Sequence, residues 1–401
     1  MKIDEKIVEM VPTMIQWRQF LHAHPETAFE EHQTSDFIAS TLSSFGISVH
    51  RGLGKTGVVG TLKRGEASGK SIGLRADIDA LDIEEESIVP YKSQNDGKMH
   101  ACGHDGHTAM LLGAAKYLSQ NDAFAGTVHF IFQPGEENEG GGKVMVDDGL
   151  FEFFPCDAVY GMHNLPQLPM GYFALRPGPM MAAYDVFDIH IKGVGGHAAM
   201  PHLIKDPILT SSYMIGMFQS IISRNVNPVE SAVISVTKLN AGTNYNIIPN
   251  VVTLQGTTRH FQPHIQEMIE ARMKEVVAGV SVSMGVETEI RYERRYPPTV
   301  NSEKETNHAI QAASRVVGKE KVITDLPPIM GSEDFAFMLM KKPGAYIGLG
   351  YGEPRQNGLL HQSGYDFNDA LLPIGTAYWV SLVNLQLPTG NEQAENEGWK
   401  I

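Results

Sequence analysis

The segment from Met99 to Met110 concentrates side chains that bind metal ions. It reads Met-His-Ala-Cys-Gly-His-Asp-Gly-His-Thr-Ala-Met, and so combines a thiol, three imidazoles and a carboxylate. Thiolate and imidazole are the ligands that transition metals prefer, at about 2.0 to 2.3 Å from the ion. A lone cysteine is more commonly a small buried apolar residue. Other parts of the chain, however, favour Cys102 and His104 as metal ligands.

Two adjacent carboxylates, Glu136 and Glu137, follow the apolar run Val128–Phe132 after the three residues Gln-Pro-Gly. Such a pair is ordinarily solvated on the surface. Here the pair leaves the end of a predicted buried strand, and Gly140–Gly142 allows a close approach of the backbone. One carboxylate can then bind a metal ion while the other accepts a proton from water. This division of roles predicts metal-assisted hydrolysis, with Glu137 as a ligand and Glu136 as the base.

Two more histidines extend the ligand set. His163 follows the apolar run Asp157–Met162, and His361 follows a glycine-rich segment. A single histidine is more commonly structural, but filling two coordination spheres requires about this number of donors. We therefore expect two divalent ions with five protein ligands: Cys102, His104, Glu137, His163 and His361. Zinc is favoured by affinity, while manganese, cobalt and nickel stay open.

Alternating strand and helix patterns must position these residues. Helices are predicted at Ile3–His24, Glu30–Phe45 and Thr108–Leu118, and strands at Val58–Leu62, Ile72–Ile78, Val128–Phe132 and Asp157–Met162. This alternation predicts an α/β fold with a doubly wound, mostly parallel sheet. Ligands bind beyond the carboxyl ends of the strands in such sheets, where Asp77 and Asp79 also lie. We expect Asp79 to hold a metal ligand in place by hydrogen bonding.

The pattern changes between about Tyr184 and Tyr296. Strands and helices follow one another there in the order βαββαβ, which is typical of a ferredoxin-like domain. Because the α/β pattern resumes afterwards, this domain is predicted to be an insertion. The expected division is a discontinuous catalytic domain, 1–183 and 297–401, and an inserted domain, 184–296.

The composition limits the function further. A chain of 401 residues with 42% hydrophobic and 19% charged residues is typical of a soluble protein with two domains. The formal charge of -14 repels phosphate backbones, so no nucleic-acid partner is expected. The two cysteines fit a reducing compartment, and neither a signal peptide nor a membrane span of about 20 apolar residues is visible. These features predict a cytoplasmic protein without a membrane partner.

Motifs in five places, in this order along the chain, resemble the aminoacylase and carboxypeptidase family of binuclear metallohydrolases. They are His100–His107, Gln133–Glu137, Gly161–Asn164, Gly196–His202 and Ser332–Phe335. The resemblance is to the branch that contains hippurate hydrolases, N-acyl-amino-acid amidohydrolases and plant auxin-conjugate hydrolases. It spans about Trp17 to Leu385, and it departs from relatives at Asp77, where the wider family has His, and at Asp82, where the branch usually has Pro. The roles of these two residues therefore stay open.

The resemblance implies that the inserted domain is a lid that forms a homodimer, and that the substrate is an N-acyl amino acid. It implies the same ligand set, with Glu136 as the base. It also implies that His197 reaches across the dimer to stabilise the oxyanion, although a loop histidine is the simpler interpretation. Dipeptidases and carboxypeptidases use the same centre, so these activities remain alternatives, and a metal-dependent binding protein without catalysis is a third.

Four lid and loop residues are similar to those that hold the substrate carboxylate: Asn246, Arg259, Gly331 and Ser332. Arginine suits this task through paired hydrogen bonds, whereas an arginine at a strand end is more commonly solvated. The segment Ile329–Phe335 is predicted to open a helix whose free N–H groups would bind the same carboxylate. The competing interpretation of Ser332 is an ordinary helix cap.

Overall fold

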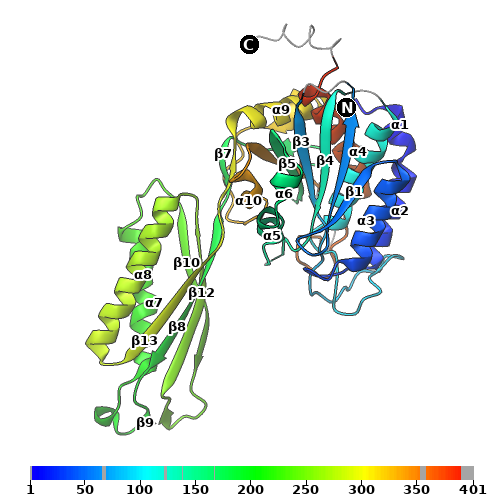
Figure 1. Ribbon diagram of the computed structural model, residues 1–401. Coiled ribbons are helices and arrows are strands. Elements are labelled where there is room, and N and C mark those ends of the chain that lie inside the picture. Colours follow the sequence, from blue (N-terminus) through cyan, green and yellow to red (C-terminus); the bar gives the residue numbers. More distant parts are fainter. Residues whose placement is uncertain are drawn as a thin grey trace. The chain divides into compact units, whose positions relative to one another are not determined.

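The computed structural model describes residues 2–65, 69–121, 124–137, 139–166, 168–352 and 358–389. They form two compact units, both drawn in Figure 1. Unit 1 consists of Met1–Met180, Val300–Pro327 and Asp334–Ile401, and unit 2 consists of Met181–Thr299 and Pro328–Glu333. The chain enters unit 2 through strand β7 (Gly178–Met181) and returns through β14 (Thr299–Asn301).

Unit 1 is built on a mixed sheet whose central strands are parallel. The order of its eight strands is β1 (Ser48–Leu53), β2 (Gly57–Arg64), β4 (Gly126–Gln133), β3 (Ser71–Asp77), β5 (Ala158–Leu165), β16 (Gly344–Gly350), β6 (Phe173–Ala174) and β15 (Val322–Ile323). The four central strands β4, β3, β5 and β16 run parallel to one another. Their residues are almost continuously buried, because helices cover both faces of a parallel sheet. The predicted fold class is confirmed.

Helices complete the core of unit 1. They are α1 (Glu5–Glu9), α2 (Val11–Ala23), α3 (His32–Ser44), α4 (His104–Gln120), α5 (Gly141–Asp147), α6 (Leu150–Phe153), α9 (Glu303–Val317), α10 (Ala336–Leu339) and α11 (Leu372–Gln386), with the short helical turns η2 (Lys319–Lys321) and η3 (Asp369–Leu371). Helix α4 contacts β3, β4 and β5 and packs against α2 and α11. It is almost entirely buried, so its first turn can hold functional side chains rigidly.

Three predicted helix boundaries differ from the structure. The helix predicted from Ile3 to His24 is two helices, because α2 restarts with Pro12 in its first turn, where proline needs no hydrogen-bonded N–H. Helix α4 begins at His104 and not near Thr108. The helix predicted to open in the segment Ile329–Phe335 is only the four-residue α10, Ala336–Leu339. The N-cap of α10 is Phe335, so Ser332 does not cap this helix.

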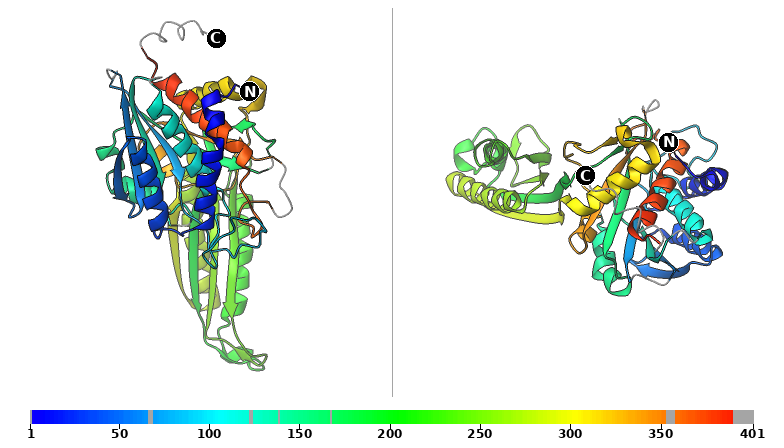
Figure 2. Two further views of the ribbon diagram at one scale, coloured as in Figure 1. Left: turned by 90° about the vertical axis from the view of Figure 1, so that its right-hand side faces the viewer. Right: turned by 90° about the horizontal axis from the view of Figure 1, so that it is seen from above.

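Unit 2 has the predicted βαββαβ order. Its antiparallel sheet has the order β10 (Ala232–Ala241), β12 (Val251–His260), β8 (Ala183–Lys192) and β13 (Glu287–Tyr296). Helices α7 (Pro207–Arg224) and α8 (Pro263–Met284) pack side by side on this sheet, as Figures 1 and 2 show. A second apolar core lies between them, and the fold is ferredoxin-like.

A short pair of strands lies beyond one end of this sheet. It is formed by β9 (Gly196–His197) and β11 (Ile247–Ile248), next to the helical turn η1 (Pro201–Leu203). Among the described residues of both units, no helix combines the length and the apolar character that a membrane span requires.

Candidate metal centre and substrate site

The carboxyl ends of three neighbouring parallel strands carry the predicted functional residues of unit 1. Asp77 ends β3, Glu136 and Glu137 follow β4, and His163 lies near the end of β5. Helix α4 adds His104 at its first position. Parallel strands place their carboxyl ends at one edge of the sheet, where ligands bind in open α/β sheets. Residues far apart in the sequence are thereby brought to one place.

The predicted ligands and the predicted base form one connected cluster. Ligand atoms of Cys102, Glu137 and His361 lie within 4.8 Å of one another, and so do those of His104, Glu136 and Glu137. The Sγ atom of Cys102 lies 3.4 Å from Nε2 of His163. The Nε2 atom of His361 lies 3.1 Å from Oε1 of Glu137. The structure therefore brings all six side chains together.

Gly103 shapes the turn between the two ligands of the Cys-Gly-His sequence. Its φ of 93° is left-handed, and a Cβ atom there would lie 2.6 Å from Oδ1 of Asn164 and 2.7 Å from the hydroxyl of Tyr365. Only glycine fits this position. The turn starts α4 at His104 and leaves Cys102 just before the helix.

His361 occupies an unusual backbone conformation. Its φ is 63°, in the left-handed region that residues other than glycine rarely adopt. The backbone N–H of His361 donates to the carbonyl of Ala101 at 2.8 Å, which fastens its loop to the segment that holds Cys102. Strained backbone of this kind clusters at functional sites. The conformation agrees with a ligand role for this half-exposed side chain.

The protonation of two imidazoles suits metal binding. Nδ1 of His104 donates to the carbonyl of Asp79 at 2.9 Å, and Nδ1 of His163 donates to the carbonyl of Asn164 at 2.8 Å. When Nε2 is deprotonated, as in a metal-bound imidazole, its lone pair points into the cluster in each ring. Nε2 of His104 is buried and has no hydrogen-bond partner among the described residues. A carbonyl that fixes the tautomer in this way is typical of metal-binding histidines.

Asp79 supports the cluster from two sides. The backbone carbonyl of Asp79 accepts from Nδ1 of His104, and its side-chain Oδ2 accepts from the backbone N–H of Glu137 at 2.9 Å. It therefore connects two predicted ligands without entering the cluster itself. The geometry agrees with the supporting role expected for Asp79.

The carboxylate of Asp77 lies between the side chains of His107 and Arg75. Its Oδ1 lies 2.6 Å from Nδ1 of His107, and its Oδ2 accepts from Nη1 of Arg75 at 2.8 Å. Nε2 of His107 lies 2.7 Å from Oδ1 of Asn164, so both nitrogens of His107 are engaged. His107 therefore positions Asp77. The Oδ2 atom of Asp77 also lies near the predicted ligand His104, 3.8 Å from its Nε2 atom.

The electrostatics of the cluster favour a cation. Burial, followed by the charges of Glu137 and Glu136, raises the pKa of the Cys102 thiol well above its usual value. Burial disfavours a charged His104, but the carboxylates of Asp77 and Asp79 outweigh it and raise its pKa to about 10. Burial lowers the pKa of His163 well below its usual value, so that ring is neutral. Bound cations would offset these carboxylates and favour the thiolate. The donor set thus fits divalent metal ions.

Sequence reasoning missed a buried polar network beside the cluster. Nε of Arg75 donates to Gln133 at 2.9 Å, and its Nη2 donates to Asp334 at 3.0 Å. Asp334 also accepts from the amide of Gln133 at 2.8 Å and from the N–H of Gly142 at 2.7 Å. Gln133 and Asp334 both lie inside the recognised motifs, which was the available signal. The network fixes the ends of β3 and β4.

A second missed network fastens the start of α4. Nδ1 of His22 lies 2.9 Å from Asp105, and its Nε2 lies 3.2 Å from Glu85. Burial opposes a charge on His22, but Asp105 and Glu85 raise its pKa to about 9. The protonated ring therefore bridges two buried carboxylates. Since Asp105 follows His104 directly, this bridge restrains a predicted ligand.

The candidate residues of unit 2 fall into two groups. His197 lies in β9, opposite Ile247 of β11, and the carbonyl of Asn246 accepts from the N–H of Ala198 at 3.0 Å. His197 and Asn246 are therefore neighbours, and both side chains are exposed. Arg259 lies at the other end of β12, opposite Tyr184. Arg259 lies eight positions after Val251 in this extended strand, a distance of about 26 Å.

Arg259 lies close to the predicted carboxylate-binding segment Gly331–Ser332. Its Nε donates to the carbonyl of Met330 at 3.2 Å. The same segment is fastened to the start of unit 2, because Gly331 accepts from the N–H of Ala182 at 2.9 Å. Unit 2 therefore places Arg259 beside Met330, two residues before Ser332, and separates it from Asn246.

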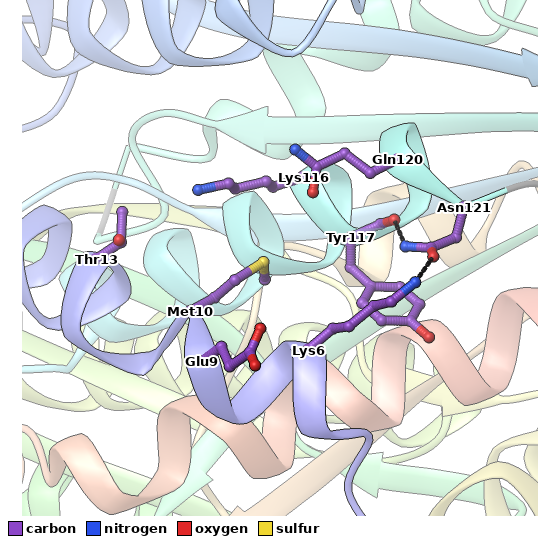
Figure 3. A pocket seen from close by; sticks show the side chains of 8 residues that line it. All are labelled: Lys6, Glu9, Met10, Thr13, Lys116, Tyr117, Gln120 and Asn121. Atoms are coloured by element: carbon purple, nitrogen blue, oxygen red, sulfur yellow. Dashed lines mark hydrogen bonds between the residues drawn. The ribbon is translucent and has the colours of Figure 1, made fainter.

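A surface hollow lies away from this chemistry. It has a volume of about 480 Å³ and is lined by residues of α1, α2 and the end of α4, among them Lys6, Lys116 and Asn121 (Figure 3). Lys6 donates to the side chain of Asn121 at 2.7 Å across it. Lys116 lies twelve positions after His104, a distance of about 18 Å along α4.

Comparisons with known proteins agree with the geometry. The family model of peptidase family M20/M25/M40 matches residues 73–385. The chain is 40% identical to the hippurate hydrolase of Campylobacter jejuni, over 95% of this chain and 98% of that one. It is 36% identical to an IAA-amino acid hydrolase of Arabidopsis thaliana, over 93% of this chain and 86% of that one.

A solved structure extends the likeness to the fold. The YXEP protein of Bacillus subtilis, described as a dinuclear metal binding peptidase from the M20 family, superimposes with a TM-score of 0.82. It is 33% identical in sequence, over 95% of this chain and 99% of that one. The resemblance found in the sequence motifs is confirmed: the chain belongs to peptidase family M20/M25/M40 and is a metal-dependent amidohydrolase.

Proposed function

We propose that the chain hydrolyses the amide bond of N-acyl amino acids, such as N-benzoyl- or N-acetyl-amino acids. The observation that carries this proposal is the convergence of five donor side chains around Glu136 at the carboxyl ends of parallel strands. The hippurate hydrolase and IAA-amino acid hydrolase among its relatives support an acylated amino acid as substrate.

The cofactors proposed are two divalent ions, zinc or manganese, with cobalt or nickel as further candidates. The residues that would hold them are Cys102, His104, Glu137, His163 and His361. Ions bound there would polarise the scissile carbonyl and lower the pKa of water. Thiolate and imidazole ligands support zinc by affinity, while the metal loaded depends on availability.

Glu136 is the proposed general base and acid. Its carboxylate group lies within reach of His104 and Glu137, and its side chain is 8% exposed. It would accept a proton from the attacking water and deliver it to the nitrogen of the leaving amino acid. Asp79 would keep His104 and Glu137 in place during these steps.

His197 is the proposed donor to the carbonyl oxygen, and it would act in the active site of a partner subunit. The separation within unit 2 supports this proposal. One small carboxylate cannot span the roughly 26 Å between the ends of β12, so Asn246 and Arg259 of one chain cannot hold it together. A second copy of the chain would supply His197 and Asn246, while the first supplies Arg259 and Ser332.

A homodimer through unit 2 is the proposed assembly. Helix α7 carries an exposed apolar stripe at helical spacing: Leu209, Tyr213 and Met217 are 45%, 52% and 45% exposed. The stripe adjoins β10, an edge strand whose backbone is available for pairing. We further propose that the protein is cytoplasmic. Its two cysteines, Cys102 and Cys156, are free and buried, which supports a reducing compartment.

A substrate panel tests the proposed function. The protein, loaded in turn with zinc and manganese and checked by elemental analysis, is assayed with N-benzoyl-, N-acetyl- and aminoacyl-amino acids that share one amino acid. The expected result is metal-dependent release of amino acid with the highest kcat/KM on the acylated substrates. Preference for aminoacyl substrates would assign a dipeptidase, and preference for longer peptides a carboxypeptidase. No hydrolysis across the panel by the fully loaded protein would contradict the proposal.

A further inference from the structure

We propose that Tyr184 and Thr257 lock the guanidinium of Arg259 so that it presents a single nitrogen, Nη2, to the substrate carboxylate. This inference rests on the proposed function and adds two positioning residues to it. All the residues concerned lie in unit 2. The lock would make these two residues determinants of the preference for a free carboxylate over a neutral group.

Hydrogen bonds to the protein occupy two of the three nitrogens of Arg259. Nε donates to the carbonyl of Met330 at 3.2 Å. Nη1 donates to the carbonyl of Thr258 at 3.0 Å and also to the hydroxyl of Thr257. Nη2 has no hydrogen-bond partner among the described residues. The paired edges that normally bind a carboxylate both include Nε or Nη1, and both are therefore engaged.

Tyr184 fixes the plane of the guanidinium. The Cζ atom of Arg259 lies 4.4 Å from the centre of the Tyr184 ring, within the range of a cation–π contact. The two residues are direct partners in the register of β12 and β8. Tyr184 is itself held by Tyr296, whose ring centre lies 5.8 Å away at an angle of 88°. Arg259 thus lies against an aromatic surface that is fixed by the sheet.

Thr257 fixes the rotation of the guanidinium within that plane. Its hydroxyl donates to the carbonyl of Asp185 at 2.8 Å. With its proton committed there, the hydroxyl oxygen can only accept, and it accepts from Nη1 of Arg259. The side chain of Arg259 is therefore oriented before any ligand arrives.

A second observation points to a ligand at the free end of Arg259. The hydroxyl of Ser332 is buried and has no hydrogen-bond partner among the described residues. It lies two residues from Met330, whose carbonyl Arg259 contacts. A carboxylate can accept from Nη2 with one oxygen and from Ser332 with the other. This division replaces the paired contact that the locked guanidinium cannot make.

Binding to a hydrolytically inactive background tests the lock. The metal-loaded Glu136→Gln protein is titrated by calorimetry with N-benzoylglycine and with N-benzoylglycinamide, which lacks the negative charge. Tyr184→Leu and Thr257→Val are introduced separately into this background. Each should weaken N-benzoylglycine binding roughly three- to tenfold, the range of a partly buried cation–π or charge-assisted contact. Neither should change the affinity for N-benzoylglycinamide.

A conservative variant separates positioning from general damage to unit 2. Tyr184→Phe retains the aromatic ring and should retain the ratio of the two affinities. Equal weakening of both ligands by Tyr184→Leu, unchanged binding of both, or no preference for the carboxylate in the background protein would each overturn the proposal. The failure of the proposed function is measured independently, as absence of turnover by the wild-type protein.

Discussion

Units 1 and 2 hold their candidate functional residues in contrasting ways. In unit 1 the predicted ligands Cys102 and His104 are buried, and the backbone carbonyl of Asp79 orients His104. In unit 2 His197 and Asn246 are exposed at one end of the sheet, and Arg259 lies at the other end. One region is complete within a single unit, whereas the other is divided along the length of a strand.

The contrast follows from the task of each region. Clustered carboxylates and a buried thiol are costly without cations, so the fold must fix them by hydrogen bonds before the ions bind. The exposed His197 and Asn246 carry no such cost and can remain solvated until a ligand or a partner subunit arrives. The first region should therefore depend on single side chains, and the second on assembly.

The largest expected effect tests the completeness of the unit 1 site. Glu136→Gln should lower kcat by about 10³- to 10⁴-fold, because the amide cannot accept the proton of water. The metal content should not change, since Glu136 is not among the proposed ligands. Steady-state kinetics and elemental analysis measure the two quantities. The matched control is Glu139→Gln, an exposed residue of the same loop. Activity retained by Glu136→Gln would remove this residue from the role of base.

The next largest effect tests whether the unit 2 site is divided between subunits. His197→Ala should lower kcat by about 10²- to 10³-fold, the loss expected for one oxyanion donor. Mixing the His197→Ala protein with the Glu136→Gln protein under conditions that exchange subunits should restore about a quarter of wild-type activity. Half of the dimers then contain one subunit of each kind, and each of these has one intact site out of two.

Two controls sharpen this mixing experiment. Substituting Tyr213 on the exposed stripe of α7 by Asp should give a monomer by light scattering and should abolish the restored activity. If the mixture of His197→Ala and Glu136→Gln stays inactive although subunits exchange, then His197 does not act across the dimer.

The sequence predicted the unit 1 cluster well because its residues sit at predictable places. Strand periodicity located the ends of β3, β4 and β5, and the rule for ligand sites in parallel sheets brought Asp77, Glu136 and His163 to one edge. The roles of the ligands stay predictions until metal binding is measured. Their proximity, however, follows from local pattern and strand order alone.

Contacts between distant residues were beyond sequence reasoning. The Arg75–Asp334 pair joins residues 259 positions apart, and no periodicity links them. The left-handed backbone of His361 depends on a loop that is fastened to Ala101 by a single backbone hydrogen bond. The separation of Asn246 from Arg259, in contrast, was implicit in the predicted βαββαβ order, because a strand of that order that ends at Arg259 keeps its two ends apart.

The two units should also differ in their response to acid. Burial lowers the pKa of His129 in unit 1 to about 4, from 6.5, so the unfolded chain takes up a proton below pH 6.5 while the folded chain does not. The free energy of unfolding is therefore unaffected by His129 above about pH 6.5, and it falls by up to about 3 kcal/mol as the pH decreases to 4. His129→Gln should make the free energy of unfolding, measured by urea denaturation, depend less on pH across this window. An equally steep loss in the variant would contradict this assignment.

Unit 2 should keep its stability to lower pH. Burial opposes the charge of Asp185, but hydrogen bonds from His260 and Gln266 outweigh it and lower the pKa of this carboxylate. Its contribution is therefore complete above the unfolded value of 3.8 and is lost as the pH falls below it. Near-ultraviolet circular dichroism measures the loss of tertiary structure with falling pH. The difference between the wild-type protein and His129→Gln should appear between pH 6.5 and 4, and the difference between the wild-type protein and Asp185→Asn should appear below pH 3.8.

The smallest expected effect concerns the support of the metal ligands by Asp79. Asp79→Asn replaces Oδ2, which accepts from the N–H of Glu137, with a group that can donate in its place. The carbonyl that orients His104 is retained, so the loss should be partial. Metal affinity should fall about 10- to 100-fold in competition with a chelator, the range for residues that orient metal ligands.

Asp82→Asn provides the matched control. The exposed carboxylate of Asp82 lies three residues further along the same loop, and the substitution removes the same charge. If both variants weaken metal binding equally, then Asp79 acts only through the overall negative field. If only Asp79→Asn does, then the hydrogen bond to Glu137 fixes this ligand, and the unit 1 site is preorganised in a way that the exposed His197 and Asn246 of unit 2 are not.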